Sequence, residues 1–323
     1  MRILIIGGTL FLGRAFANLM VREKWKTMDP VEIILINRGN AKKPDGVDKM
    51  LAADRHNGAA LQNLGLRGEL FDAVVDFCAY EEKDIAFLVQ NLGIRFTQYI
   101  FISTCDVYKR FEGRRLDENG PLEDRVFPGE EGAYVAGKVK LEEELKQVCR
   151  EKKAHYTSIR PSMIYGPNNY APREGIYFNW INKAGQIIQP FNATGFFQLV
   201  YVEDVAKAIF LTLGNKDAYD QAFNVCGTDV ENYLTFFKGL QHAITGRKIR
   251  CVYMTVDEIR KKNIGLPFPL TEEESEEYRG NRIQELGLTY TSLGDGLAAS
   301  WDAFEKEQYE QKTYIQPPKL VLN

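Results

Sequence analysis

Short apolar runs alternate with amphipathic helical patterns from the first residue of this chain to about residue 160. Helical spacing of apolar residues is found over 11–23, 84–92 and 134–150. This alternation is typical of βαβ units, whose right-handed crossovers place helices on both faces of a parallel sheet. The runs expected to be strands are Arg2–Ile6, Val31–Asn37, Lys49–Ala52, Ala73–Phe77, Gln98–Ser103 and Tyr156–Ile159. The pattern therefore predicts an α/β fold built on a doubly wound parallel sheet.

The first apolar run ends in a glycine-containing turn that leads into the first helical pattern. The segment reads Ile3-Leu-Ile-Ile-Gly7-Gly8-Thr9-Leu10-Phe11-Leu12-Gly13. Gly7 permits a tight turn, and Gly13 lets the helix pack close to the strand. A strand, a glycine turn and a helix start in this order present helix amides that bind a pyrophosphate. The position at the first βα junction favours a bound dinucleotide over a turn without a ligand.

The composition of the chain changes after Pro161. Residues 165–195 are rich in Gly, Pro, Asn and aromatic residues, which predicts loops around one helix and a cap over a substrate. Sheet-like runs return at Leu199–Val202 and Ala222–Cys226, with a helical pattern at Glu203–Leu213. We therefore expect two interleaved domains. They are a dinucleotide-binding domain from 1–164 and 198–226, and a smaller substrate-binding portion from 165–197 and 227–323.

Charge and hydropathy patterning limit the partners of the chain. It has 41 basic and 44 acidic residues, a net charge of -3 and no basic run longer than a pair. This balance offers no electrostatic footprint for nucleic acid or for an anionic membrane surface. No apolar run approaches the ~18 residues of a membrane span. We expect a small-molecule substrate and neither nucleic acid nor membrane as partner.

Cysteine and histidine usage bears on compartment and metal content. The 5 cysteines are odd in number and show no Cys-x-x-Cys spacing, which indicates reduced thiols in a cytoplasmic protein. His56, His155 and His242 lie far apart in the sequence and make no ligand spacing. We predict a cytoplasmic protein without a bound metal.

The spacing from Gly7 to Gly13 resembles that of the short-chain dehydrogenase/reductase superfamily. The form of this glycine motif is similar to that of the extended branch of the superfamily, the NAD-dependent epimerase/dehydratase family. The resemblance implies a Rossmann-type domain that binds NAD or NADP. Leu10 stands where that family usually has a glycine. This departure resembles a subgroup that includes the chloroplast stem-loop-binding proteins.

Asn37 and Arg38 follow the second predicted strand, where a ribose-binding residue is expected. Asn can hydrogen-bond a 2′-hydroxyl, and Arg offers the fork that a 2′-phosphate prefers, so NAD and NADP both stay open. The resemblance also implies that Asp54 meets the adenine and that Cys78 and Ala79 lie beneath the adenosine. The positions expected to contact the dinucleotide are Gly7, Thr9, Phe11, Leu12, Gly13, Asn37, Arg38, Asp54, Cys78, Ala79, Tyr134, Lys138, Pro161 and Met163.

Tyr134 and Lys138 are four residues apart and therefore neighbours on one helix face. The end of the strand before them resembles the family segment that supplies a catalytic Ser or Thr, which selects Thr104, with Ser103 as the alternative. The resemblance implies that Tyr134 takes the proton of a substrate carbinol while NAD(P) takes the hydride. It also implies that Lys138 lowers the tyrosine pKa and holds the nicotinamide ribose.

Departures from the family pattern make some of the family's reactions and substrates less expected for this chain. Cys105-Asp106 stands where dehydratases of the family have an Asp–Glu pair, and a cysteine is a poor general acid. Phe197-Gln198 lies where many members have an Arg that meets the substrate diphosphate, which weakens a nucleotide-sugar assignment. We expect an epimerase or oxidoreductase acting on a carbinol of a sugar-nucleotide-like substrate. The alternative is a dinucleotide-binding sensor or RNA-binding protein with little or no catalysis.

The resemblance also implies a homodimer. The family commonly pairs the helix that carries Tyr134 with the helix found here at Asp84–Leu92, and Val135 and Val139 would then face outward. The same helix carries the run Glu142-Glu143-Glu144, which could equally mark a solvated face.

Overall fold

The computed structural model of the chain describes residues 1–109, 115–171 and 173–306. The chain forms two compact units whose segments interleave along the sequence. The first unit comprises Met1–Ser162, Glu203–Cys226 and Tyr278–Thr289. The second comprises Met163–Val202, Gly227–Glu277 and the described residues from Tyr290 onward. The segment Tyr278–Thr289 thus belongs to the first unit although it follows most of the second.

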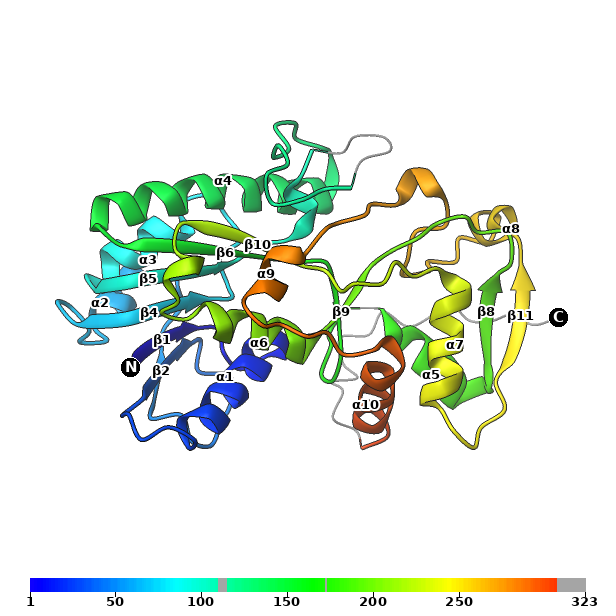
Figure 1. Cartoon of the computed structure of the whole chain (residues 1–323), viewed down its shortest axis with the longest axis horizontal. Helices are drawn as coiled ribbons and strands as arrows, with labels where there is room; N and C mark the ends of the chain where they lie inside the picture. The colour runs from blue at the N-terminus through cyan, green and yellow to red at the C-terminus, as the bar shows by residue number, and fades with distance from the viewer. Residues whose placement is uncertain (110–114, 172, 307–323) are drawn as a thin grey trace. The chain divides into compact units, whose positions relative to one another are not determined.

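A seven-stranded parallel sheet forms the centre of the first unit (Figure 1). The strand order is β10-β6-β5-β4-β1-β2-β3, so the order reverses between β1 and β4. In open α/β sheets, ligands bind outside the carboxyl ends of the strands at such a switch point. The strand bounds are β1 (Arg2–Ile6), β2 (Glu32–Asn37), β3 (Lys49–Ala52), β4 (Leu70–Asp76), β5 (Arg95–Ile102), β6 (His155–Pro161) and β10 (Gln221–Val225). The expected doubly wound parallel sheet is confirmed.

Two strands start 3 residues earlier than the hydrophobic pattern predicts. β4 starts at Leu70 instead of Ala73, and β5 starts at Arg95 instead of Gln98. In the added part, Phe71 pairs with Phe96, and both rings are buried. Charged residues beside these aromatics break up the apolar run, which is why the sequence pattern shortens both strands.

Helices cover both faces of this sheet. α3 (Asp84–Leu92) and α4 (Gly129–Lys152) lie on one face, and α1 (Phe11–Lys24) and α6 (Val202–Thr212) on the other (Figure 1). Because strand residues alternate between faces, Leu4 and Ile6 pack with α3 and α4 while their neighbours in β1 face the other layer. The remaining helical elements of this unit are α2 (Gly58–Gln62), α9 (Asn281–Glu285), η1 (Cys105–Val107) and η2 (Lys216–Ala218).

The second unit is built around an aromatic core. Phe197 stacks on Phe268 with ring centroids 4.2 Å apart, and Tyr177 and Phe236 pack beside them. Its strands form two parallel pairs, β7 (Met163–Tyr165) with β9 (Leu199–Tyr201) and β8 (Gln186–Pro190) with β11 (Arg250–Met254). Its helices are α5 (Glu174–Ala184), α7 (Tyr233–Ala243), α8 (Val256–Lys261), η3 (Glu272–Glu274) and α10 (Leu293–Glu305).

Candidate functional site

The glycine turn after β1 is packed so closely that side chains are excluded at two positions. Gly7 has φ +88°, and a Cβ there would lie 2.0 Å from the Cys78 sulfur. Gly13, in the first turn of α1, has no room for a Cβ because one would lie 2.5 Å from the Gly7 carbonyl oxygen. The two glycines therefore bring strand, turn and helix together as a dinucleotide-binding turn requires.

The start of α1 has the properties of an anion-binding end. Leu10 precedes the helix in an extended conformation, no side chain caps the helix, and its first turn holds no acidic residue. The partial positive charge of the helix end is therefore not offset by a carboxylate of its own first turn. Leu10, which replaces the usual glycine, is 53% exposed and does not pack beneath the turn. These residues fit a pyrophosphate.

Asn37 joins the end of β2 to the glycine turn. Its amide nitrogen lies 3.4 Å from the Thr9 hydroxyl oxygen, and its side-chain oxygen accepts a hydrogen bond from the Gly39 amide at 2.8 Å. Arg38, the next residue, is exposed. Sequence reasoning expected both residues near a ribose, and the structure brings Asn37 to the turn while Arg38 faces solvent.

The residues expected on the adenine side lie on the loops that follow β3 and β4. Asp54 is exposed and accepts a hydrogen bond from the His56 amide at 2.8 Å. The Cys78 thiol lies against Gly7, and burial raises its pKa to about 11, so the thiol is protonated at neutral pH. Ala79 is fully buried, and its carbonyl oxygen accepts a hydrogen bond from Lys138. The loop after β4 thus connects the glycine turn to the lysine on α4.

Lys138 is a buried cation of α4 that bonds to the loop after β4 and to the end of β5. Its side-chain nitrogen donates to the carbonyl oxygens of Ala79 at 2.9 Å and Ile102 at 2.8 Å. It lies 5.6 Å from the ring centroid of Tyr134, and the ring of Tyr80 is nearer, at 4.6 Å. Burial is the main reason that its pKa is lowered to about 8. Tyr134 itself is 37% exposed, so this helix face presents a phenol to solvent and an ammonium to the interior.

Gly137 allows α4 to approach the loop after β4. A Cβ at this position would lie 2.4 Å from the Tyr80 carbonyl oxygen. Any larger residue would therefore push the helix away from the loop that anchors Lys138. Neither the contact nor Tyr80 was anticipated from the sequence, because the two partners are 57 residues apart on the chain.

The hydroxyl residues at the end of β5 have different partners. The Ser103 hydroxyl donates to the Glu142 carboxylate at 2.7 Å. The Thr104 hydroxyl donates to the Asp106 carboxylate at 2.9 Å and accepts from the Asp106 amide at 3.2 Å. Cys105, which follows Thr104, is fully buried, and its thiol donates to the Arg160 carbonyl oxygen. Burial raises the pKa of this thiol well above the ordinary range.

Glu142 is the most consequential residue that sequence reasoning missed. Its run of three glutamates suggested a solvated face, but Glu142 is fully buried. Arg160 binds it in a bidentate pair at 2.8 and 2.5 Å. A signal was present in the sequence, because Glu142 follows Tyr134 and Lys138 at the same spacing of four and therefore lies on their face of α4.

The last two positions expected at the nicotinamide end fall in different units. Pro161 ends β6 in the first unit and pairs with Val225 of β10. Met163 opens β7 in the second unit and pairs with Leu199. The structure thus places Pro161 at the same sheet edge as the glycine turn, and it assigns Met163 to the other unit.

Among the described residues, 1–109, 115–171 and 173–306, no group of three or more His, Cys, Asp or Glu side chains could hold a metal ion. No helix in the same part of the chain is long and apolar enough to cross a membrane.

Comparison with solved structures shows that the fold is that of sugar-nucleotide epimerases and dehydratases. A UDP-glucose 4-epimerase from Thermotoga maritima with UDP-glucose aligns at a TM-score of 0.72 and 17% identity, covering 95% of this chain and 99% of that one. A UDP-glucose 4-epimerase from Thermus thermophilus with NAD gives 0.69 and 17%, covering 94% and 99%. A dTDP-glucose 4,6-dehydratase from Bacillus anthracis with NAD gives 0.70 and 16%, covering 96% and 98%.

Sequence comparison adds a relative and a family. The chain is 31% identical over 243 residues to the chloroplast stem-loop binding protein of 41 kDa b from Arabidopsis thaliana. That match spans 73% of this chain and 60% of the length of the plant protein. Residues 83–226, which include Thr104, Tyr134 and Lys138, match the model of the NAD dependent epimerase/dehydratase family. The chain thus matches the NAD dependent epimerase/dehydratase family over residues 83–226, and its fold is similar to that of solved sugar-nucleotide epimerases and dehydratases.

Proposed function

We propose that the protein is an NAD(P)-dependent epimerase or oxidoreductase that acts on a carbinol. One observation carries the proposal: the buried Lys138 ammonium lies 5.6 Å from the ring of Tyr134 and is anchored to the carboxyl end of β5, beside Thr104. A phenol, an ammonium and a hydroxyl near the carboxyl end of a strand in a doubly wound sheet suit proton transfer to and from a substrate oxygen.

Tyr134 acts as the base in this proposal. A free phenol titrates at about 10, so use near pH 7 needs a pKa about 3 lower, or roughly 4 kcal/mol of preferential phenolate stabilisation. Lys138 supplies part of it, because the ammonium is charged below pH 8 and sits in a low-dielectric interior. Its two carbonyl partners fix the ammonium in place, so the charge needs no reorganisation during the reaction.

Thr104 is the hydroxyl that meets the reacting oxygen in this proposal. In the structure its proton is directed to Asp106, and it accepts a hydrogen bond from the Asp106 amide. A carbinol has a single hydroxyl proton, which Tyr134 takes, so Thr104 stabilises the reacting oxygen by turning its own proton from Asp106 toward it. Ser103, the alternative from the sequence, has its proton on Glu142.

The glycine turn holds the pyrophosphate of the dinucleotide in this proposal. Gly7 and Gly13 make the close backbone approach, and the uncapped start of α1 faces the anion. When bound, NAD(P)+ supplies the hydride acceptor. Asn37 hydrogen-bonds the ribose 2′-hydroxyl of NAD in this proposal, and the exposed Arg38 can bind the 2′-phosphate of NADP. Either dinucleotide therefore fits.

Dehydration is less favoured than epimerisation or dehydrogenation. Cys105 is fully buried, and its thiol, bound to the Arg160 carbonyl oxygen, cannot act as the acid that water loss needs. Phe197 and Gln198 are both buried in the second unit, Phe197 stacking on Phe268. A sugar-nucleotide-like substrate is therefore proposed on the strength of the fold and not of a diphosphate-binding arginine.

The cofactor and the base are tested separately. Mass spectrometry of small molecules released from the purified protein should detect NAD or NADP, and tightly held cofactor favours an epimerase over a dehydrogenase. On a carbinol and nucleotide-sugar panel, Tyr134→Phe should lower turnover by about 10²–10⁴-fold and keep dinucleotide affinity. Full activity of Tyr134→Phe on a substrate of the wild type would rule out this mechanism.

A second candidate follows from the plant relative, which is named a stem-loop binding protein. Under this alternative the chain binds a dinucleotide as a sensor, or RNA, with little catalysis. The net charge of -3 speaks against RNA, since phosphate binding requires basic side chains. Salt-dependent binding of a stem-loop RNA at micromolar protein, together with no turnover on the panel, would favour this candidate over the enzyme.

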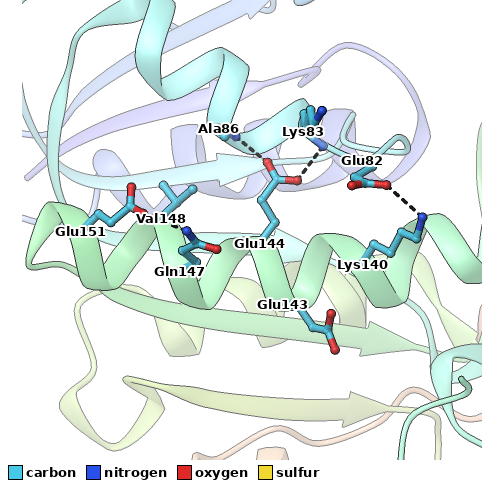
Figure 2. Close-up of a pocket in the computed structure, with 9 residues that line it drawn as sticks. All are labelled: Glu82, Lys83, Ala86, Lys140, Glu143, Glu144, Gln147, Val148 and Glu151. Atoms are coloured by element: carbon cyan, nitrogen blue, oxygen red, sulfur yellow. Dashed lines mark hydrogen bonds and ion pairs between the residues drawn. The ribbon is translucent and has the colours of Figure 1, made fainter.

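We also propose a homodimer that uses the groove between α3 and α4. Figure 2 shows this groove, in which Glu144 points to the start of α3 and accepts the amides of Lys83 and Ala86. Lys140 pairs with Glu82 across it at 2.9 Å. The groove is polar, so the seam would be weaker in high salt. A monomeric mass by light scattering at tens of micromolar protein would refute a stable dimer.

The cytoplasmic location stays part of this proposal. None of the 5 cysteines, all of which the structure describes, is in a disulfide, and Cys105, Cys149 and Cys226 among them are buried. Reduced thiols suit a compartment with a glutathione pool. Fractionation of the source cells with an antibody to the protein tests the location directly.

A further inference from the structure

A buried arginine ties the two loops that flank the adenine side of the site. Arg55 directly follows Asp54, and it is only 9% exposed. Its guanidinium makes a bidentate pair with Asp76 at 3.0 and 3.1 Å, and Asp76 is fully buried at the end of β4. The same guanidinium donates to the Asp84 carbonyl oxygen at 2.9 Å. Arg55 therefore bonds to the two residues that flank the loop after β4, the last residue of β4 and the first residue of α3.

The carboxylates of Asp76 and Asp84 accept further hydrogen bonds, three of them from backbone amides of the same loop. Asp76 accepts the Cys78 amide at 2.9 Å and the Tyr99 hydroxyl at 2.6 Å. Asp84 accepts the amides of Tyr80 at 2.8 Å and Glu81 at 3.0 Å. The loop residue between these fixed points, Ala79, provides the carbonyl that binds Lys138.

We propose that Arg55 is a positioning residue that fixes the Ala79 carbonyl and thereby the Lys138 ammonium, coupling the adenine end of the site to the catalytic end. The inference rests on the proposed function for its consequence in dinucleotide binding, but the geometry of Lys138 can be measured without a cofactor. An arginine suits this role because its planar guanidinium can bind both oxygens of a carboxylate and still donate to a separate carbonyl oxygen.

The test uses a neutral double variant, Arg55→Met with Asp76→Asn. Arg55→Met alone would leave a buried, unpaired carboxylate and could unfold the protein, whereas removing both charges of a buried pair is tolerated better. Asn can still accept the Cys78 amide. The matched control is Arg2→Met with Glu32→Gln, which neutralises an ion pair at the opposite, amino end of β1.

The first readout is the pKa of Lys138 in the protein without added cofactor, followed by NMR of labelled lysine side chains and assigned with Lys138→Met. Asp76 raises this pKa and Arg55 lowers it, and the effect of Asp76 is the larger. Loss of both charges alone would therefore lower the pKa slightly. Release of the loop would instead admit water around the ammonium and raise the pKa from about 8 by about 1 or more. The sign separates geometry from direct electrostatics.

The second readout is the affinity for NADH and NADPH, measured by their fluorescence. The double variant should bind the better of the two at least about tenfold more weakly, the equivalent of one charge-assisted hydrogen bond, while the control binds as the wild type does. An unchanged or lowered pKa of Lys138 in a folded double variant would overturn the inference. If the wild type binds neither dinucleotide, the proposed function fails, and the Lys138 titration still decides the role of Arg55.

Discussion

Ser103 and Thr104 are adjacent in the chain, yet their hydroxyls donate to different carboxylates, Glu142 and Asp106. Ser103 belongs to a buried network that continues through Glu142 to Arg160 and then to the Tyr108 hydroxyl at 2.7 Å. Thr104 instead caps the short helix η1, and its proton goes to the carboxylate of Asp106, two residues further along the chain. The structure thus separates a residue that serves the interior from one that can serve a ligand.

Removal of the Thr104 hydroxyl should therefore affect turnover most, whereas removal of the Ser103 hydroxyl should affect stability most. Thr104→Ala should lower turnover by about 10²-fold or more and cost about 1 kcal/mol of stability through the lost cap. Ser103→Ala should cost about 1–2 kcal/mol because Glu142 loses a donor, with a smaller effect on turnover. Urea midpoints and turnover of both variants measure this, and a larger loss of turnover in Ser103→Ala would reverse the assignment.

Arg38 should determine the preference between the dinucleotides. If it meets a 2′-phosphate, Arg38→Ala weakens NADP binding by at least about 1.5 kcal/mol and leaves NAD binding nearly unchanged. Isothermal titration with both dinucleotides measures the difference. Lys42→Ala, which removes a charge from the same exposed loop, is the control. Equal losses for NAD and NADP would refute this role.

Gly137→Ala should behave unlike most glycine substitutions in helices. Alanine normally stabilises a helix interior by roughly 1 kcal/mol relative to glycine. Here the added Cβ would lie 2.4 Å from the Tyr80 carbonyl oxygen, so α4 must shift and the variant should be destabilised and bind dinucleotide more weakly.

The control for this prediction is Gly239→Ala in α7. A Cβ there meets only leucine side-chain carbons, the nearest at 3.0 Å, and these can move. Thermal denaturation of the two variants should show the larger loss for Gly137→Ala. A stabilised Gly137→Ala protein with unchanged dinucleotide affinity would contradict the close approach of helix and loop.

Lys138 should give the folded protein a stability that rises with pH in the alkaline range. Its pKa is about 8 when folded, below the ordinary value of 10.5. Below pH 8 both states are protonated, and the folded state bears the cost of a buried charge. Between these values the unfolded state binds more protons, so stability increases with pH, by up to about 3 kcal/mol. Urea titrations from pH 7 to pH 10.5 should show this rise relative to Lys138→Met, and parallel curves would contradict it.

Local patterns in the sequence were sufficient for the elements that frame the site. The helix Asp84–Leu92 and the strands Arg2–Ile6 and Lys49–Ala52 have the predicted bounds. Their apolar spacing and the Gly and polar residues that bound them are local properties of the sequence. Because both faces of the sheet are buried, its strands are largely apolar runs. The glycine turn was equally legible, because strand, glycines and helix are contiguous.

The partners of the polar side chains could not be obtained in this way. Glu142 reads as part of a charged run, and its burial depends on Arg160, 18 residues later. Arg55 reads as a loop cation, and its role depends on Asp76, 21 residues away. Whether a carboxylate is solvated or buried is determined by the residues that pack over it. The neighbouring sequence does not identify those residues.

The sequence by itself therefore determined the architecture and the chemistry available: a doubly wound sheet, a glycine turn and a Tyr–Lys helix. Only the tertiary structure decided which hydroxyl bonds to the buried Glu142, which arginine is buried and that Tyr278–Thr289 joins the first unit. Periodicity and turn chemistry act between near neighbours in the chain. Burial, hydrogen-bond partners and the pKa of Lys138 arise from groups that only folding brings within a few ångströms of one another.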